Sequence, residues 1–570
     1  MSGEGGRTAR AIARAVTIAL VLFAVQGALL APWVERERVA TRIAVEPVEG
    51  LEVPAEIKLL ETALGSFRGA LINVLWLRAT SLQEEGRVHE AMQLAQWITR
   101  LQPYFPQVWS YQARNLSDNL SVTTTDPAER YEWVRAGIEM LRDQGIRYNR
   151  ESKFLYRELA YVFWFKLGGE SRDEYREYYW RRFAIEWDEI LGEPQGDSAE
   201  ARAAWLLPIA EAPATLDELI AAHPGLAEAR DDYAIILADR RIDFLRAIRE
   251  AQRSSTSSVD PDLAAFVTFL RAQVLRRDYS MDPWLMVDLT RELGPIDWRH
   301  AASHAAYWSA CGILRVETHE AFPRFEPQYR DELEEDHIVS IALKQLIARG
   351  RMVGDPRGPY IREPDFRFIE AYERGILEGD PFTVTEVPEE YRFSYFQVLE
   401  LGVERAWVRG DDETARSFLA RLGRFFDEPG DDPREWLLAQ FELELPEERA
   451  DADLEIEDRI LRQLYAMMEE GWTAQNELVA TRRRELAESL WSRARLAGAE
   501  LRPFDELVEH AIASYLRQLP LYVTARSKAA VWARMDAEQR AAVPEWLLEQ
   551  LRDDARRSGL DPLEAFPATP

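Results

Sequence analysis

The stretch that decides the fold is LWLRATSL at residues 75–82, which returns as WSYQARNL at 109–116 and as YRELAYVF at 156–163. The first two copies are 34 residues apart, and the third follows after an insertion of 13 residues. A period of 34 residues is typical of the tetratricopeptide repeat (TPR), in which each copy is a pair of antiparallel helices. The sequence therefore predicts stacked helical hairpins.

The first copy indicates how such a hairpin is encoded. Leu75, Ala79 and Leu82 share one face of a helix, and the small side chain of Ala79 allows a partner helix to approach closely. Gly86 then supplies the turn, and Pro103 follows the second helix, where proline is common. The match is degenerate, so an ordinary amphipathic helix pair with the same spacing is the alternative interpretation.

Helix-start signals recur along the rest of the chain. Asp126 is followed by Pro127 and Glu129, an arrangement that satisfies the free amide groups of a helix N-terminus. The same device returns at Asp432 and Asp561, and Thr215 begins a capping box. We place the 13-residue insertion in a loop at 123–125. Because alternating strand patterns are few, the predicted fold class is all-α, a TPR-like α-solenoid with an N-terminal transmembrane helix.

The predicted organisation has seven parts. They are an N-terminal tail (1–14), a transmembrane anchor (15–34), a juxtamembrane connector (35–66), TPR-like repeats (67–191), a helical middle region (192–320), a loop-rich connection (321–389) and a C-terminal helical region with a TPR-like hairpin (390–570). Glycines and prolines in 192–215 predict a boundary between subdomains.

Composition narrows the classes of function. The chain has 570 residues, more than one core usually holds, and 47% of them are hydrophobic, as in a folded protein. Its net charge of −29 repels nucleic acid, so nucleic acid is not expected as a partner. The single cysteine, Cys311, excludes an internal disulfide, and its apolar neighbours predict a buried, inert thiol.

Residues 15–34 form a run of 20 residues without a charge, between Arg14 and Glu35. A helix of this length is about 30 Å long, enough to cross the core of a bilayer. The predicted topology is a single span with the N-terminus inside and the large domain outside the cytoplasm. A cleaved signal peptide with its cleavage site near 25–27 is the alternative.

Four segments carry a resemblance to a known family: RGALINVLWLRATSLQEEG (68–86), QWITRLQPYFPQVW (96–109), the run from DYSMDPW to GPIDWR (278–299) and HAASHAAYW (300–308). Over residues 64–315 the chain resembles a family of membrane-anchored, TPR-like bacterial proteins that has no assigned activity. The resemblance implies a helical-repeat fold anchored in the bacterial inner (cytoplasmic) membrane. It carries over no catalytic residue and no cofactor.

Two sets of residues could carry chemistry. His300 and His304 have the spacing of a two-histidine metal site on a helix, with His319 or Glu317 as a third ligand. However, Ala301 stands where a metalloprotease helix needs glutamate, and histidines hydrogen-bonded in a helix interface are the alternative. The pair Glu488 and Ser489 resembles the catalytic pair of lytic transglycosylases, but it lies in an ordinary amphipathic helix pattern.

The loop 349–367 reverses the local sign of charge in this acidic chain. It contains five arginines, namely Arg349, Arg351, Arg357, Arg362 and Arg367. Such a loop could receive an acidic partner or a carboxylate group. The alternative is a structural connection whose arginines pair with acidic residues of the same chain.

These observations favour a membrane-anchored scaffold or adaptor that binds a protein or peptide partner, with neither catalysis nor a cofactor or metal expected. The candidate partner-binding residues are Asn73, Gln83, Tyr111, Asn115, Arg157, Arg351, Arg357 and Arg362. The alternative function is an extracytoplasmic superhelical or toroidal hydrolase acting on glycans, for which the 18 tryptophans and abundant carboxylates are suggestive.

Overall fold

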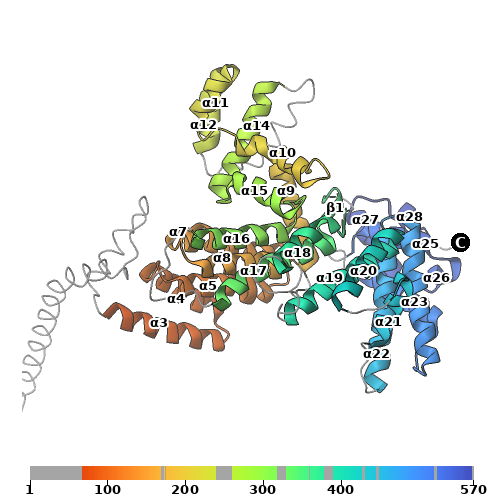
Figure 1. The fold of residues 1–570 in the computed structure, drawn as a ribbon. Coiled ribbons are helices and arrows are strands. Elements are labelled where there is room, and N and C mark those ends of the chain that lie inside the picture. The colour runs from red at the N-terminus through yellow and green to blue at the C-terminus, as the bar shows by residue number, and fades with distance from the viewer. Residues whose placement is uncertain are drawn as a thin grey trace, which may run out of the picture. The chain divides into compact units, whose positions relative to one another are not determined.

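The computed structural model describes residues 67–168, 173, 175–238, 260–317, 329–357, 360–377, 389–426, 430–443, 449–518 and 523–567 (Figure 1). The predicted tail, anchor and connector (1–66) and His319 lie outside these residues. No helix in the described part of the chain is both long enough and apolar enough to cross a membrane. Apart from one β-hairpin the described residues are mostly helical, which confirms the all-α prediction.

The chain forms two compact units. Unit 1 comprises residues up to Val162 together with 308–338, and unit 2 comprises residues 163–307 and 339–570. Each unit is therefore built from two separate stretches of sequence. The described helices of unit 1 are α3 (Phe67–Glu84), α4 (Val88–Leu101), α5 (Pro106–Arg114), η1 (Asn115–Leu120), η2 (Ser121–Thr123), α6 (Pro127–Glu139), η3 (Met140–Gly145), α7 (Ile146–Tyr148) and α8 (Lys153–Tyr161).

The first repeat forms the predicted hairpin. Helices α3 and α4 pack against each other, and Gly86 between them adopts a φ of 75°, which favours glycine. Ala79 has no exposed surface, as expected where two helices approach closely. The core beneath the hairpin contains Ile72, Ile98, Leu101 and Val108, with Leu75 and Trp76 packed against it.

The 13-residue insertion is not in the loop at 123–125, where we expected it. The turn between the paired helices has the same length in both repeats (85–87 and 124–126), and so has the connection to the next repeat (102–105 and 149–152). Instead, the first helix of the second repeat continues five residues further past the motif, to Thr123, and the second helix is eight residues longer, ending at Tyr148. Each lengthened helix contains a π-helical segment, η1 or η3, the form in which α-helices absorb inserted residues.

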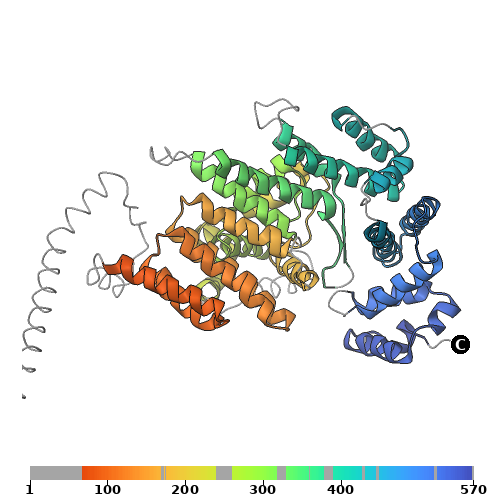
Figure 2. The ribbon, with the colours of Figure 1, turned by 90° about the horizontal axis from the view of Figure 1, so that it is seen from below.

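The remaining described helices lie wholly or partly in unit 2, whose C-terminal helices are drawn in blue in Figure 2. Three elements include residues of both units: η4 (Val162–Leu167), α16 (Ala301–Glu317) and α17 (Tyr329–Arg349). The others, before the hairpin, are α9 (Arg176–Leu191), α10 (Ala199–Ala210), α11 (Leu216–Ala222), η5 (Pro224–Ala229), α12 (Arg230–Ala238), α14 (Pro261–Gln273), η6 (Val274–Asp278) and α15 (Pro283–Leu293).

The second half of unit 2 is helical, both in 390–570, where helices were predicted, and in 366–377, which lies in the stretch predicted to be a loop-rich connection. It contains η7 (Phe366–Phe368), α18 (Ile369–Leu377), α19 (Glu389–Val408), α20 (Asp412–Phe426), α21 (Pro433–Leu443), α22 (Arg449–Ala466), η8 (Met467–Trp472), α23 (Glu477–Leu496), α24 (Phe504–Arg517), α25 (Ala525–Arg534), α26 (Ala537–Ala541), α27 (Glu545–Arg557) and α28 (Pro562–Ala565). Helices α19 and α20 form the predicted second hairpin, with Gly410 at a φ of 84°.

Two stretches form regular structure that the sequence did not predict. Within 192–215, where a boundary between subdomains was predicted, the chain forms α10, whose first turn is capped by the Ser198 hydroxyl and which continues through Pro208. The arginine-rich loop forms a two-stranded antiparallel β-hairpin, β1 (Arg351–Gly354) and β2 (Tyr360–Glu363), with Arg351 opposite Glu363. The strands have only four residues each, too few for the alternation of polar and apolar side chains to stand out in the sequence.

The predicted helix starts are confirmed. The side chain of Asp126 accepts a hydrogen bond from the Ala128 amide, and Asp432 and Asp561 accept equivalent bonds from Arg434 and Leu563. Thr215 forms the complete capping box with Glu218. These signals were readable because a cap depends only on residues within one turn of it.

Candidate functional site

A continuous row of side chains crosses the first helices of the repeats in unit 1. The rings of Trp76 on α3 and Tyr111 on α5 meet edge to face, with their centroids 4.7 Å apart. One turn further along α5, the guanidinium group of Arg114 lies 5.2 Å from the centre of the Tyr161 ring on α8. We call this row the repeat surface and define it as Asn73, Trp76, Tyr111, Arg114, Arg157 and Tyr161.

A buried carboxylate joins two helices of this row. Glu158 on α8 is 4% exposed, and it accepts hydrogen bonds from the Ser110 hydroxyl at 2.6 Å and from Arg114 Nε and Nη2 at 2.7 and 2.9 Å. This two-point contact fixes the guanidinium plane, and the Glu158 hydrogen bonds raise the pKa of Arg114 further above its ordinary value. The position of Arg114 is therefore set by the fold itself.

The repeat candidates from the sequence fall into different environments. Asn73 is exposed on α3, whereas Tyr111 and Arg157 are half-buried, and the Arg157 guanidinium lies 5.3 Å from the Phe154 ring. Asn115 is only 3% exposed and accepts a hydrogen bond from Asn119, so we leave it out of the repeat surface. Gln83 lies in the last turn of α3, and its side chain is outside the described part. Trp76, Arg114 and Tyr161 were not candidates from the sequence, and they belong to the repeat surface because of the contacts that they make in the structure.

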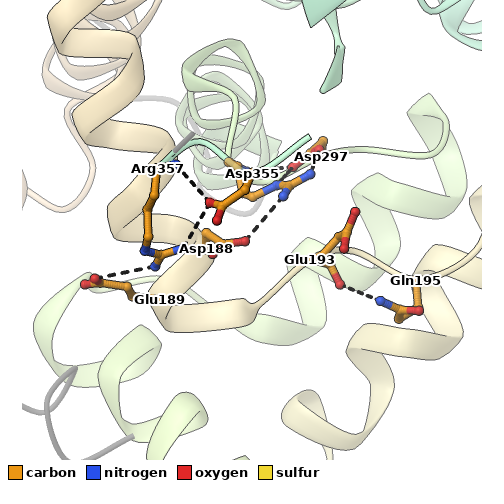
Figure 3. A network of polar contacts seen from close by, with 8 residues as sticks. Asp188, Glu189, Glu193, Gln195, Asp297, Asp355 and Arg357 are labelled. Carbon is orange, nitrogen blue, oxygen red and sulfur yellow. Dashed lines mark hydrogen bonds and ion pairs between the residues drawn. The ribbon is translucent and has the colours of Figure 1, made fainter. Parts of the chain in front are cut away.

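The arginine-rich segment pairs mainly with acidic residues of the same chain. Arg357, in the turn of the hairpin, donates to Asp188 at 2.6 Å and contacts Glu189 and Asp355 at 3.5 and 3.4 Å (Figure 3). Asp188 also accepts from Arg299, which forms a two-point pair with Asp297. Arg367 pairs with Asp365 in the same way. The network fixes the hairpin to the end of α9, while Arg351 is exposed.

The remaining two arginines of this segment belong to a second candidate site in unit 2. The guanidinium carbon of Arg362 lies 3.0 Å from the centre of the Trp180 ring, and that of Arg349 lies 5.7 Å from it. The Arg362 side chain is 12% exposed, and its Nη2 is 3.7 Å from a carboxylate oxygen of Glu177. We call this site the Trp180 cluster. Its members are Glu177 and Trp180 from α9, His300 before α16, Arg349 from the end of α17, Arg362 from β2 and Glu469 from η8.

Two adjacent carboxyl groups on η8 have pKa values displaced in opposite directions. Glu469 is an exposed residue, yet partial burial of its carboxyl group, followed by the charges of Glu177 and Glu470, raises its pKa to about 7. Burial opposes ionisation of Glu470 too, but ion pairs with Arg405 and Arg483 outweigh it and lower the pKa of Glu470 to about 2. Glu469 can therefore exchange a proton near neutral pH.

The two histidines occupy unlike positions. His300 precedes α16, and its Nδ1 accepts a hydrogen bond from the Ala302 amide. His304 Nε2 lies 2.9 Å from the Trp298 carbonyl oxygen, and its ring is packed between Phe183 and Trp187. No group of three or more metal-ligating side chains occurs within the described ranges. These contacts agree with the alternative to a metal site given in the sequence analysis, in which the two histidines are hydrogen-bonded within a helix interface.

The remaining sequence candidates lie on ordinary helix surfaces. Glu488 is exposed on α23, and the neighbouring Ser489 hydroxyl accepts a hydrogen bond from Arg434 at 2.7 Å. Cys311 was expected to be fully buried, but it is partly exposed on α16. The glycan-hydrolase alternative gains nothing from Glu488 and stays a hypothesis.

Comparison of the chain with known protein families, with curated proteins and with solved structures finds no match in any of the three. The resemblance to membrane-anchored, TPR-like bacterial proteins therefore rests on the sequence segments quoted above. The function has to be argued from the two sites themselves.

Proposed function

We propose that the protein is a membrane-anchored helical-repeat adaptor, and that the repeat surface binds a protein or peptide partner. The observation that carries this proposal is the row of contacts across α3, α5 and α8, which joins the first helices of successive repeats. Helical hairpins stacked in this way form the extended binding surfaces of α-solenoids. The uncharged run at 15–34 supplies the anchor.

The chemistry of the repeat surface suits an extended peptide. Tryptophan, tyrosine and arginine are the residues most enriched among those that dominate binding energy at protein interfaces. Trp76, Tyr111 and Tyr161 are held half-buried, so little side-chain entropy is lost when a partner covers them. The exposed amide of Asn73 can both donate to and accept from a peptide backbone.

Exposed apolar side chains beside the row support the same proposal. Leu71, Val74 and Leu77 on α3 are 37%, 61% and 73% exposed, and Trp97 on α4 is 54% exposed. Leu71, Val74 and Leu77 are three residues apart and follow one side of the helix. Apolar side chains grouped on a surface in this way are typical of protein interaction sites.

Site-specific photocrosslinking in native membranes tests this function. A photoreactive phenylalanine analogue in place of Asn73 is expected to capture a discrete partner that mass spectrometry identifies. The matched control carries the analogue in place of Trp546, which is 57% exposed on α27 in unit 2. The purified partner should then bind the Tyr111→Ala variant about tenfold more weakly than the wild type, as is typical for loss of a central aromatic contact.

Two results would contradict the proposal. One is the same set of crosslinked proteins from both positions, which would indicate nonspecific collisions. The other is a partner captured at position 73 whose affinity is unchanged both by Tyr111→Ala and by Arg157→Ala. Circular dichroism of the variants establishes that they are folded.

A further inference from the structure

The Trp180 cluster has more hydrogen-bond donors than acceptors. Trp180 and His300 are each 5% exposed, and neither the indole N–H of Trp180 nor His300 Nε2 has a partner among the described residues. Because the Ala302 amide donates to His300 Nδ1, this ring nitrogen carries no proton, and the proton of the neutral ring lies on Nε2. A buried N–H without an acceptor is unfavourable, so a bound acceptor would be stabilised here.

Positive charge accumulates at the same place. Arg349 and Arg362 both lie at the Trp180 ring, and both act on His300: burial first, and then these two charges, lower the pKa of His300 to about 3. The neutral imidazole can therefore only donate from Nε2 at physiological pH. Arg349 has no carboxylate within 4 Å in the ranges that the structure describes, and its side chain is exposed.

We propose that the Trp180 cluster binds the carboxylate group of an organic acid, held by the guanidinium group of Arg349 together with Arg362 above the Trp180 ring. A planar guanidinium group matches a carboxylate through two parallel hydrogen bonds. The site lies in unit 2, so this inference is independent of the adaptor function assigned to the repeat surface in unit 1.

The acidic residues of the Trp180 cluster favour binding of a carboxylate over binding of a phosphate. Glu177 is 3.7 Å from Arg362, and Glu469 lies near enough to both arginines for their charges to act on it. A doubly charged phosphate is repelled by these groups more strongly than a singly charged carboxylate. In its protonated form, Glu469 can also donate a hydrogen bond to a bound carboxylate.

Thermal unfolding of the full chain in detergent, followed by intrinsic tryptophan fluorescence, tests this site. The probes are sodium acetate, N-acetylalanine and sodium phosphate at equal ionic strength and pH 8, where phosphate is mainly doubly charged and Glu469 is mainly ionised. N-acetylalanine stands for a peptide C-terminus and acetate for a small acid. At roughly ten times Kd, a carboxylate should raise Tm by about 1–2 °C, whereas phosphate should not. The carboxylate with the larger effect indicates which source the site prefers.

Two matched variants separate this site from a general salt effect. Arg349→Gln removes the exposed guanidinium group and should abolish the rise in Tm. Arg416→Gln removes an exposed arginine of α20, outside the cluster, and should leave the rise unchanged. The proposal is overturned if neither carboxylate raises Tm of the wild type, if phosphate raises it equally, or if Arg349→Gln retains the full response. Tm without ligand establishes that both variants are folded.

Discussion

Glu469 and Glu470 are neighbours in the chain, but they should affect stability in opposite ways. The pKa of Glu469 is about 7, above the ordinary value of 4.5, so the folded protein binds this proton more tightly than the unfolded chain. The resulting stabilisation is present at low pH and is lost as the pH rises from about 4.5 through about 7. Burial and the charges of Glu177 and Glu470 raise this cost of ionisation, whereas the charges of Arg349 and Arg362 reduce it.

Glu470 has the reverse dependence. Its pKa of about 2 lies below 4.5, so its ion pairs stabilise the protein above pH 4.5, and that contribution is lost as the pH falls toward 2. The difference in stability between Glu469→Gln and the wild type should therefore shift in favour of the variant between pH 5 and pH 8. Glu470→Gln should be less stable than the wild type at pH 7. Chemical denaturation at each pH measures both differences, and equal shifts for the two variants would contradict this assignment.

The sequence predicts residues whose role is local, and it does not predict those whose role is set by distant partners. The caps at Asp126 and Thr215 were predicted because their partners are two or three residues away. Glu469 was missed because the groups that act on it, such as Glu177 and Arg362, come from other parts of the chain. Nothing near Glu469 in the sequence marks it as different from other surface carboxylates.

Arg483 joins four elements of unit 2 through ion pairs and hydrogen bonds. It is 1% exposed and contacts Glu404 on α19, Gln463 on α22 and Glu470 on η8 from its own position on α23. Burial alone would lower the pKa of this guanidinium group, but the charges of Glu404 and Glu470 raise it above the ordinary value. The guanidinium group therefore remains charged in the interior.

Removing this side chain should leave two carboxylates without their shared partner. We expect Arg483→Ala to lower the free energy of unfolding by about 3–5 kcal/mol, the usual range for breaking a buried ion pair. Arg484→Ala, at the exposed neighbouring position on the same helix, should change it by no more than about 0.5 kcal/mol. Urea denaturation followed by circular dichroism measures both, and similar losses for the two variants would refute a special role for Arg483.

At the level of elements, periodicity predicted helices well but misplaced inserted residues. The boundaries of α11 and α24 and the hairpin of α19 and α20 follow from apolar spacing and turn signals. The 13 inserted residues could not be located, because they extend the helices and leave the turns unchanged. The paired helices of the second repeat pack closely: a Cβ atom on Gly137 would lie 2.9 Å from the carbonyl oxygen of Ala113.

At the level of the whole molecule, the membrane topology is a prediction from residues 15–34. Three arginines flank this run on each side, and the topology predicted from the sequence has the N-terminus inside and the large domain outside the cytoplasm. Alkaline phosphatase fused after Pro570 should therefore be active in bacteria, and the same enzyme fused after Arg14 should be inactive. An active fluorescent protein of the type that matures only in the cytoplasm, fused after Pro570, would contradict this topology.

The sequence predicted neither the division into two units nor the composition of the Trp180 cluster. Both depend on contacts between segments more than 100 residues apart, for which a local pattern carries no signal. The repeat surface was predicted in part, because Asn73, Tyr111 and Arg157 all come from the first helices of the predicted repeats. Its fixed member, Arg114, could be recognised only once Glu158 was placed beside it.

The split composition of unit 1 affects how the chain is synthesised. Its second stretch, 308–338, begins at Trp308, whose ring stacks on that of Tyr156 with the centroids 6.3 Å apart. A ribosome adds about 5–20 residues per second, so roughly 7–30 s pass between the emergence of Val162 and that of Trp308. During that interval the contact between Tyr156 and Trp308 cannot form, and the first stretch of unit 1 lacks its second stretch. We therefore expect chaperones that bind ribosome-attached chains to bind the nascent repeats.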